Sequence, residues 1–132
     1  MTVFNFKMQA GTPIFDQVVF AAIRAFLSRE FLPGQAFLSV RTLAAELKIH
    51  PNTAHKVVQH LIRERWLEVH PGIGTVVAQP PKARAGDRQR LLQREVEELV
   101  VGAKRLGVSM QDLIQAISKE WSKLDQAREA NP

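Results

Sequence analysis

The chain has 132 residues, 45% apolar and 23% charged, with a formal net charge of +5, which excludes a disordered chain and favours an anionic partner such as nucleic acid. Its lack of cysteine excludes a disulfide framework and a thiolate metal site. No apolar run approaches the roughly 20 residues that cross a bilayer, and the first residues lack the pattern of a secretory signal, so we expect a cytoplasmic protein with no membrane partner.

The N-terminal residues predict an arm followed by a long helix. Residues 3–6 alternate, which is typical of a short strand or an ordered arm. The helix is expected to begin at Thr12-Pro13, because threonine caps helices and proline suits the first helical position. Apolar residues at helical spacing extend it to about Phe31, where Leu32-Pro33-Gly34 ends it.

Two further helices follow, joined by a tight turn. Ser39 is expected to cap a short helix that ends near Leu47. The connection Lys48-Ile49-His50 then leads into a third helix from Pro51 to about Glu64. The predicted buried stripe of the third helix consists of Ala54, Val57, Val58, Leu61 and Ile62.

The opposite face of the third helix carries only side chains that can donate a hydrogen bond. They are Asn52, Thr53, His55, Lys56, Gln59, His60 and Arg63. A helix about 10–12 Å across fits the major groove of B-DNA, and its first turns reach the base edges. Arg41, in the first turn of the preceding helix, would lie beside the same groove. These residues predict a helix-turn-helix that binds double-stranded DNA, although a solvated surface without function is the alternative.

A β-hairpin is predicted directly after the third helix. Residues 66–70 and 75–78 have the composition of strands, and the glycines of Pro71-Gly72-Ile73-Gly74 permit the positive φ of a hairpin turn. Trp66 is expected to pack against the third helix rather than to stack on a ligand. The hairpin would be the wing beside the DNA-binding helix, so residues 1–79 predict a winged helix-turn-helix domain.

Residues 80–87 are rich in proline and polar residues, which is typical of a linker. Beyond them the region 88–132 is expected to contain two helices. The first spans 88–106 and ends at Gly107 in a left-handed cap, and the second begins after a capping box at Ser109 and ends at about Gln126.

Both of these helices have apolar stripes, which we interpret as a dimer interface. Its predicted residues are Leu92, Val96, Leu99, Val100, Leu113, Ile114, Ile117, Trp121 and Leu124. Two helices are too small to be stable alone, so they exchange contacts with a second subunit or pack back onto the winged domain. The linker favours a homodimer, which would hold two recognition helices about 34–36 Å apart. The predicted fold class is therefore α+β, mostly helical, with a winged domain and a two-helix dimerisation tail.

No catalytic, metal or cofactor site is predicted. His50, His55 and His60 are spaced by five residues along the chain, which does not place two imidazoles on one side of a helix as an i, i+4 pair would. Gly72-x-Gly74 lacks the strand-to-helix context of a phosphate loop, and no nucleophile has a convincing base. An enzyme is therefore not expected, and the small-molecule effector, if one exists, stays unknown.

The ordered set of motifs between residues 13 and 77 resembles the GntR family of bacterial regulators. The matching residues are Pro13-Ile14-Phe15-x-Gln17, Leu32-Pro33-Gly34, Leu38-Ser39-Val40-Arg41-x-Leu43-Ala44, Pro51-Asn52-Thr53 and Gly72-x-Gly74-Thr75-Val76-Val77. The Pro-Asn-Thr opening and the short tail are similar to the YtrA subfamily. By that resemblance the residues that contact DNA are Arg41, Asn52, Thr53, His55 and Gly72.

The sequence departs from this family at the end of the third helix and in the wing. Arg65 stands where the family commonly has a glycine, so a different helix end is expected there. His70, Pro71 and Ile73 replace basic residues of the wing, so fewer wing contacts to phosphate are expected. We predict a dimeric, sequence-specific regulator that acts as a repressor on a two-half-site operator. A winged-helix protein-interaction module without DNA binding is the alternative.

Overall fold

The computed structural model describes residues 7–131, so the arm predicted at residues 3–6 lies outside the described part of the chain. The chain falls into two compact units. The first contains the residues up to Pro81 together with the last residues of the chain, and the second contains Lys82–Gln126. The division at Pro81 falls within the stretch that the sequence predicts as a linker.

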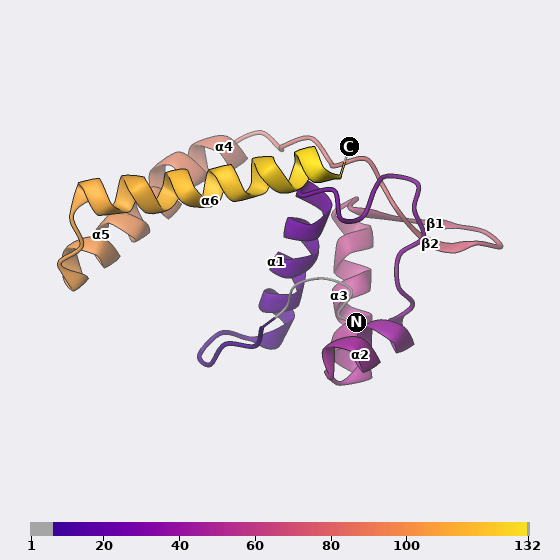
Figure 1. Cartoon of the computed structure of the whole chain (residues 1–132). Coiled ribbons are helices and arrows are strands. Elements are labelled where there is room, and N and C mark those ends of the chain that lie inside the picture. Colours follow the sequence, from indigo (N-terminus) through magenta and orange to yellow (C-terminus); the bar gives the residue numbers. More distant parts are fainter. Residues whose placement is uncertain (1–6, 132) are drawn as a thin grey trace. The chain divides into compact units, whose positions relative to one another are not determined.

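The first unit contains the helices α1 (Ile14–Leu27), α2 (Val40–Leu47) and α3 (Pro51–Arg63), and Figure 1 shows the hairpin extending to the right of them. Ser39 caps α2 as predicted, since its hydroxyl accepts a hydrogen bond from the backbone N–H of Thr42 at 3.1 Å. The α3 bounds agree with the prediction to within one residue.

The predicted ends of α1 are both wrong. Pro13 is the N-cap rather than the first helical residue, because its ψ of 138° is extended, and Thr12 supplies no side-chain cap. At the other end the helix stops at Leu27, well before Phe31. Arg29 then turns the chain with a left-handed φ of 65°, a conformation in which an α-helix cannot continue.

The core of the first unit lies between its three helices and the hairpin. Its largest fully buried side chains are Leu43, Leu61, Leu67, Val18 and Val57. The predicted stripe of α3 is buried there, with Ile62 half-buried at its edge. As expected, Trp66 packs within the unit, and its ring stacks on Phe26 with centroids 5.9 Å apart.

The strands β1 (Leu67–His70) and β2 (Gly74–Val77) form the predicted antiparallel hairpin, with Leu67 opposite Val77. Gly72 and Gly74 have φ values of 80° and 110°, as the turn requires. The chain between α1 and α2 runs beside β2, where the N–H of Phe37 donates to the carbonyl of Thr75 at 2.9 Å. This third segment attaches the wing to the helices.

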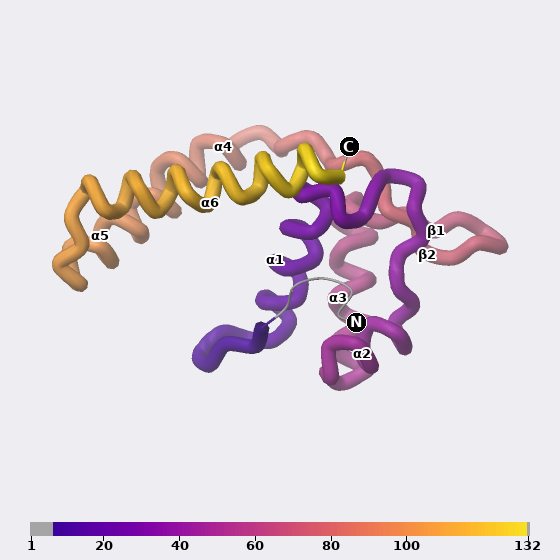
Figure 2. Tube along the Cα trace, viewed as in Figure 1, coloured from indigo at the N-terminus to yellow at the C-terminus, as the bar shows by residue number. Residues whose placement is uncertain are grey.

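The second unit is helical, and Figure 2 follows its backbone. A continuous run of α4 (Asp87–Arg90), the π-helical η1 (Leu91–Glu95) and α5 (Val96–Leu106) ends at Gly107, whose φ of 71° confirms the predicted left-handed cap. The helix α6 (Met110–Ala130) is preceded by Ser109, whose hydroxyl caps it by accepting a hydrogen bond from the Asp112 N–H. It passes the predicted end at Gln126, because Asn131 Nδ2 donates to the Ala127 carbonyl at 2.8 Å and prolongs the last turn.

Candidate nucleic-acid interface

The start of α3 is fixed by a histidine cap that the sequence did not suggest. The Nδ1 atom of His50 accepts a hydrogen bond from the backbone N–H of Asn52 at 3.0 Å. The carbonyl of His50 accepts from the N–H groups of Thr53 and Ala54. Histidine is not among the favoured caps, so Pro51 was the only signal for this helix start. The cap holds the first turn of α3 in place and leaves the Asn52 side chain free to point outward.

The donor face of α3 is open to solvent. The exposed members of the predicted set are Asn52, His55, Lys56, Gln59 and Arg63, while Thr53 and His60 are half-buried. Within residues 7–131, no hydrogen bond or ion pair engages the side chains of Asn52, Lys56 or Gln59. The face therefore keeps its donors available, and it contains no acidic residue before Glu64.

A groove runs between this face and the start of α1. It has a volume of about 770 Å³. Its lining combines two apolar residues of α1 with most of the donors of α3: Ile14, Phe15, Thr53, His55, Lys56, Gln59 and Arg63. His60 is not among them, because its ring meets the edge of Phe15 with centroids 5.4 Å apart. His60 thus belongs to the packing between α1 and α3, a role that helical spacing alone could not reveal.

Arg41 lies beside the start of α3, as the sequence predicts, and not in the groove between α3 and α1. It is exposed in the first turn of α2 and lines a shallow groove together with Ile49 and Pro51. This groove has a volume of about 520 Å³. The guanidinium of Arg41 is consequently near the end of α3 whose backbone N–H groups attract anions.

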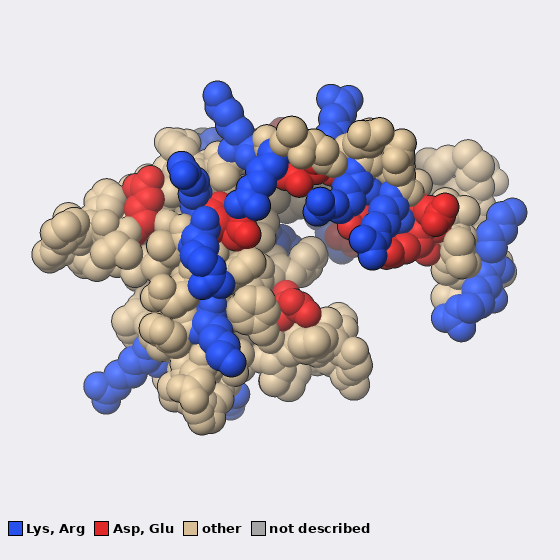
Figure 3. Space-filling model, turned by 180° about the vertical axis from the view of Figure 1, so that it is seen from behind, with Lys and Arg blue, Asp and Glu red and all other residues tan. Residues whose placement is uncertain are grey.

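Figure 3 shows where the charges of the molecule gather. On the first unit a column of Lys and Arg side chains runs along the face where α3 lies, and few acidic side chains accompany it. The wing differs from this face, because residues 66–79 contain no Lys or Arg. Within the wing, His70 Nε2 lies 3.1 Å from a Glu68 carboxylate oxygen. Gly72 is exposed at the tip of the hairpin.

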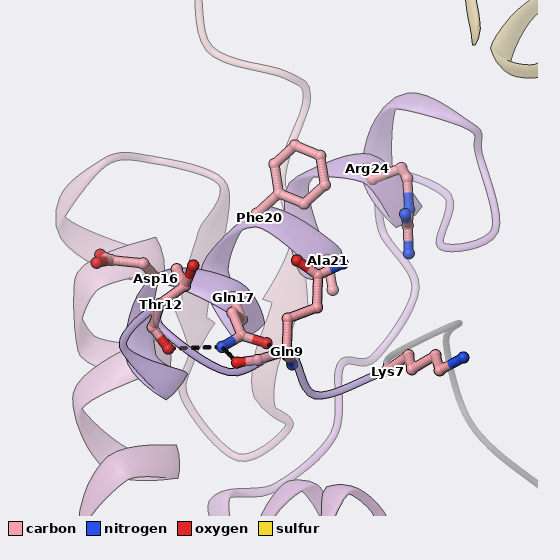
Figure 4. A pocket seen from close by; sticks show the side chains of 8 residues that line it. All are labelled: Lys7, Gln9, Thr12, Asp16, Gln17, Phe20, Ala21 and Arg24. Atoms are coloured by element: carbon pink, nitrogen blue, oxygen red, sulfur yellow. Dashed lines mark hydrogen bonds between the residues drawn. The ribbon is translucent and has the colours of Figure 1, made fainter. Parts of the chain in front are cut away.

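A second concave site lies between α1 and the segment before it, residues 7–12, which we call the N-terminal arm (Figure 4). Its volume is about 500 Å³. Gln17 holds the arm there: its Oε1 accepts from Gln9 N–H at 2.8 Å, and its Nε2 donates to the carbonyls of Gln9 and Thr12 at 2.8 and 2.6 Å. Arg24 lies over the exposed ring of Phe20, 5.6 Å from its centroid. No feature of the sequence predicted these contacts of Gln17.

The residues predicted for dimerisation lie on η1, α5 and α6, and all of them are accessible within one chain. Leu113 and Leu124 are half-buried, and the other seven are exposed. In fact no residue between Lys82 and Gln126 is buried. The second unit therefore has apolar stripes but no core of its own.

Residues 7–131 contain neither a cluster of metal-ligating side chains nor a membrane-spanning helix. In this range no three His, Cys, Asp or Glu side chains converge as metal ligands. Nor does any helix in this range combine the length and the apolar character needed to span a bilayer.

Comparison with known proteins finds, in part of the chain, the family that the sequence motifs resemble. Residues 16–77 match the model of the bacterial regulatory proteins of the gntR family. The chain is 26% identical to an uncharacterized HTH-type transcriptional regulator, YhcF of Bacillus subtilis, over 84% of this chain and 92% of that protein. It is 28% identical to the HTH-type transcriptional repressor YtrA of the same organism, over 87% and 85%. A transcriptional antiterminator structure from Listeria monocytogenes superimposes with a TM-score of 0.73 at 25% identity, over 90% of this chain and 89% of that one.

Proposed function

We propose that this chain, whose residues 16–77 match the gntR family model and which is similar to two HTH-type transcriptional regulators, binds a two-half-site operator as a homodimer and represses transcription there. The observation that carries this proposal is the face of α3. Its exposed amide, imidazole and ammonium groups can all donate hydrogen bonds and no carboxylate precedes Glu64 on this face, and such donors pair with the N7 and O6 or O4 acceptors of bases and with phosphates.

The residues of this face divide by chemistry into two roles. Asn52 is in the first turn of α3, where a helix in the major groove meets base edges, and an amide forms a bidentate pair with adenine. Lys56 is one turn further along and carries a point charge, which suits a phosphate. Thr53, His55 and Gln59 lie between or beside these two residues, and we propose that they add contacts to bases and to phosphates.

Dimerisation is supported by the accessible stripes of the second unit. An isolated helix pair without a buried residue cannot offset the conformational entropy that its folding costs. A second copy of the chain offers matching stripes, and closed twofold pairing is the commonest arrangement of soluble oligomers. The two recognition helices would then bind successive major grooves about 34–36 Å apart.

Repression is supported by the relative YtrA, which is named a repressor. A regulator with one DNA-binding unit and a short helical unit can block a promoter simply by occupying it. A protein-interaction module without DNA binding is the second candidate. The observation in its favour is the wing, which has neither Lys nor Arg in residues 66–79.

Binding to duplexes selected from a random 40-base-pair pool, measured at several salt concentrations, tests the proposal. For the wild-type protein we expect log K to fall with log salt by about 0.9 for each phosphate contacted. Asn52→Ala should reduce affinity for the selected duplex by about tenfold and leave non-specific binding unchanged. Lys56→Ala should weaken both and lower the salt slope by about 1.

Two exposed residues of α6 provide matched controls. Gln115→Ala and Lys119→Ala remove the same chemical groups far along the sequence from α3, so both should bind DNA as the wild type does. Failure of the wild-type protein to select any duplex at low salt would instead support the interaction module.

A further inference from the structure

Residues 82–94, which we call the basic segment, hold most of the excess positive charge of the chain. The segment contains five basic residues and one acidic residue, and the whole chain has a formal net charge of +5. Residues 95–132 contain five basic and seven acidic residues, so the rest of the chain after the segment is net acidic. Charge that served only solubility would be interspersed over the surface rather than gathered in one stretch. The basic residues of the segment are Lys82, Arg84, Arg88, Arg90 and Arg94.

The one carboxylate of the basic segment is used to fold it. An oxygen of Asp87 accepts the backbone N–H of Arg84 at 2.8 Å, and the Asp87 N–H donates to the Arg84 carbonyl at 3.1 Å. Gly86 lies between them with a φ of 88°, and its carbonyl accepts the N–H of Arg90 at 2.9 Å. These bonds fix the start of α4, so the basic side chains extend from an ordered turn and helix.

All five basic side chains of the segment are exposed. Within residues 7–131, those of Lys82, Arg88 and Arg90 make no hydrogen bond or ion pair. Arg94 lies 3.4 Å from Glu98, and such an exposed pair contributes little. Arg90 is two residues before Leu92 and therefore lies on the other side of the helix from the proposed dimer stripe. Pairing of two copies through that stripe would leave Arg90 accessible to a partner.

Resting on the proposed binding of α3 in a major groove, we propose that the basic segment binds phosphates of the same duplex and supplies backbone contacts that the wing lacks. The wing has no Lys or Arg in residues 66–79, whereas Lys82 follows the end of β2 at Val77 by only five residues. Five residues span at most about 16–18 Å, which is about half a turn of B-DNA. The chain can therefore bring Lys82 to the phosphates beside the winged domain.

The chemistry of the segment favours phosphates over bases. Ammonium and guanidinium groups form charge-assisted hydrogen bonds with phosphate oxygens. Contacts of this kind add affinity and fix the protein on the duplex, but they carry no sequence information. The basic segment would thus strengthen binding to every duplex, while the face of α3 would distinguish one sequence from another.

The test removes one ammonium and one guanidinium group, in Lys82→Gln combined with Arg90→Gln. The slope of log K against log salt should fall by about 1.8 for each subunit bound, since each phosphate contact contributes about 0.9. When salt is raised from 50 to 200 mM, the loss of affinity should then be roughly 12-fold smaller per subunit than in the wild type. Selected and random duplexes should lose affinity in parallel, because both present the same phosphates.

Arg105→Gln combined with Lys119→Gln is the matched control, because it removes the same two groups from exposed positions in the net acidic part of the chain. The control should retain the wild-type salt slope, and both double variants should sediment as the wild type does. A wild-type slope in Lys82→Gln with Arg90→Gln, an equal reduction in the control, or a slope lost together with the dimer overturns the proposal. None of these results bears on α3, whose role is measured by the loss of discrimination between selected and random duplexes in Asn52→Ala.

Discussion

At the scale of single residues, the histidine cap determines how well the recognition helix begins. His50 Nδ1 can accept the Asn52 N–H only while it carries no proton, so the cap requires the neutral imidazole with its proton on Nε2. A side-chain oxygen at this position would serve the same purpose. The first turn of α3 depends on this acceptor because it contains the residues proposed to reach the bases.

We therefore expect His50→Ala to lower the free energy of unfolding by about 1 kcal/mol, the usual cost of losing an N-cap. His50→Asn should restore most of it, since the asparagine oxygen caps the same N–H. Urea unfolding at one protein concentration measures both. Equal midpoints for His50→Ala and the wild-type protein would show that the cap contributes nothing.

Arg65 is a second residue whose conformation matters more than its contacts. The sequence led us to expect a different helix end here, but the left-handed turn is retained with an arginine at φ 67°. A non-glycine residue in this region costs about 1–2 kcal/mol. A glycine loses more conformational entropy on folding than other residues do, which lowers the free energy of unfolding by about 0.5–1 kcal/mol.

The strain of arginine at this φ exceeds the entropic cost of glycine, so Arg65→Gly should stabilise the protein by about 0.5–1 kcal/mol. Gln59→Gly is the matched control, because Gln59 is exposed within α3 and adopts a helical conformation. It should destabilise by about 1 kcal/mol. The two midpoints in urea should move in opposite directions, and a loss of stability in Arg65→Gly would contradict the strain at this turn.

At the scale of elements, the attachment of the arm to α1 rests on one side chain. Gln17 makes all three hydrogen bonds that hold residues 9–12 against the helix. Gln17→Ala should speed amide exchange at Gln9 several-fold, since each net hydrogen bond contributes about 1 kcal/mol. Global stability should change by less, because the arm is exposed. Amide exchange by NMR measures this, with the α3 amides as an internal reference.

Gln17→Glu separates the acceptor from the donors of the clamp. The glutamate retains an oxygen for Gln9 N–H and loses the amide that donates to two carbonyls. Protection of the Gln9 amide should lie between the wild-type and alanine values. If Gln17→Ala left exchange at Gln9 unchanged, the clamp would not hold the arm in solution.

Elements with local signals were predictable from the sequence, and elements fixed by distant contacts were not. Ser39, the glycines of the hairpin and Gly107 each specify a cap or turn through their own chemistry, and all were confirmed. The α1 start failed because proline suits both the cap and the first helical position, and only ψ separates them. In the candidate site the helical spacing of polar residues identified the donors of α3. It could not predict the contact of His60 with Phe15, because that contact joins two helices and does not alter the periodicity of either one.

At the scale of the whole molecule, the exposed apolar stripes of the second unit favour the proposed homodimer. Its apolar stripes remain in water within one chain, and covering them would stabilise a dimer by about 25 cal/mol for each Å² of apolar surface removed from water. A dimer would also bind two half-sites of the DNA at once, so two modest contacts would together give strong binding. The second contact then occurs at a high effective concentration, which raises affinity by factors of about 10²–10⁴.

A charge placed on the stripe tests this coupling between pairing and DNA binding. Leu99 is half-exposed on α5, and in Leu99→Asp a second copy would have to bury an unpaired carboxylate, which costs several kcal/mol. We expect the wild-type protein to sediment as a dimer at about 10 μM and Leu99→Asp as a monomer, with affinity for the selected duplex reduced about 100-fold or more. Gln115→Asp is the control, because it adds the same charge to the face of α6 away from the stripe and should remain dimeric. A Leu99→Asp protein that sediments and binds DNA like the wild type would place the dimer interface outside this stripe.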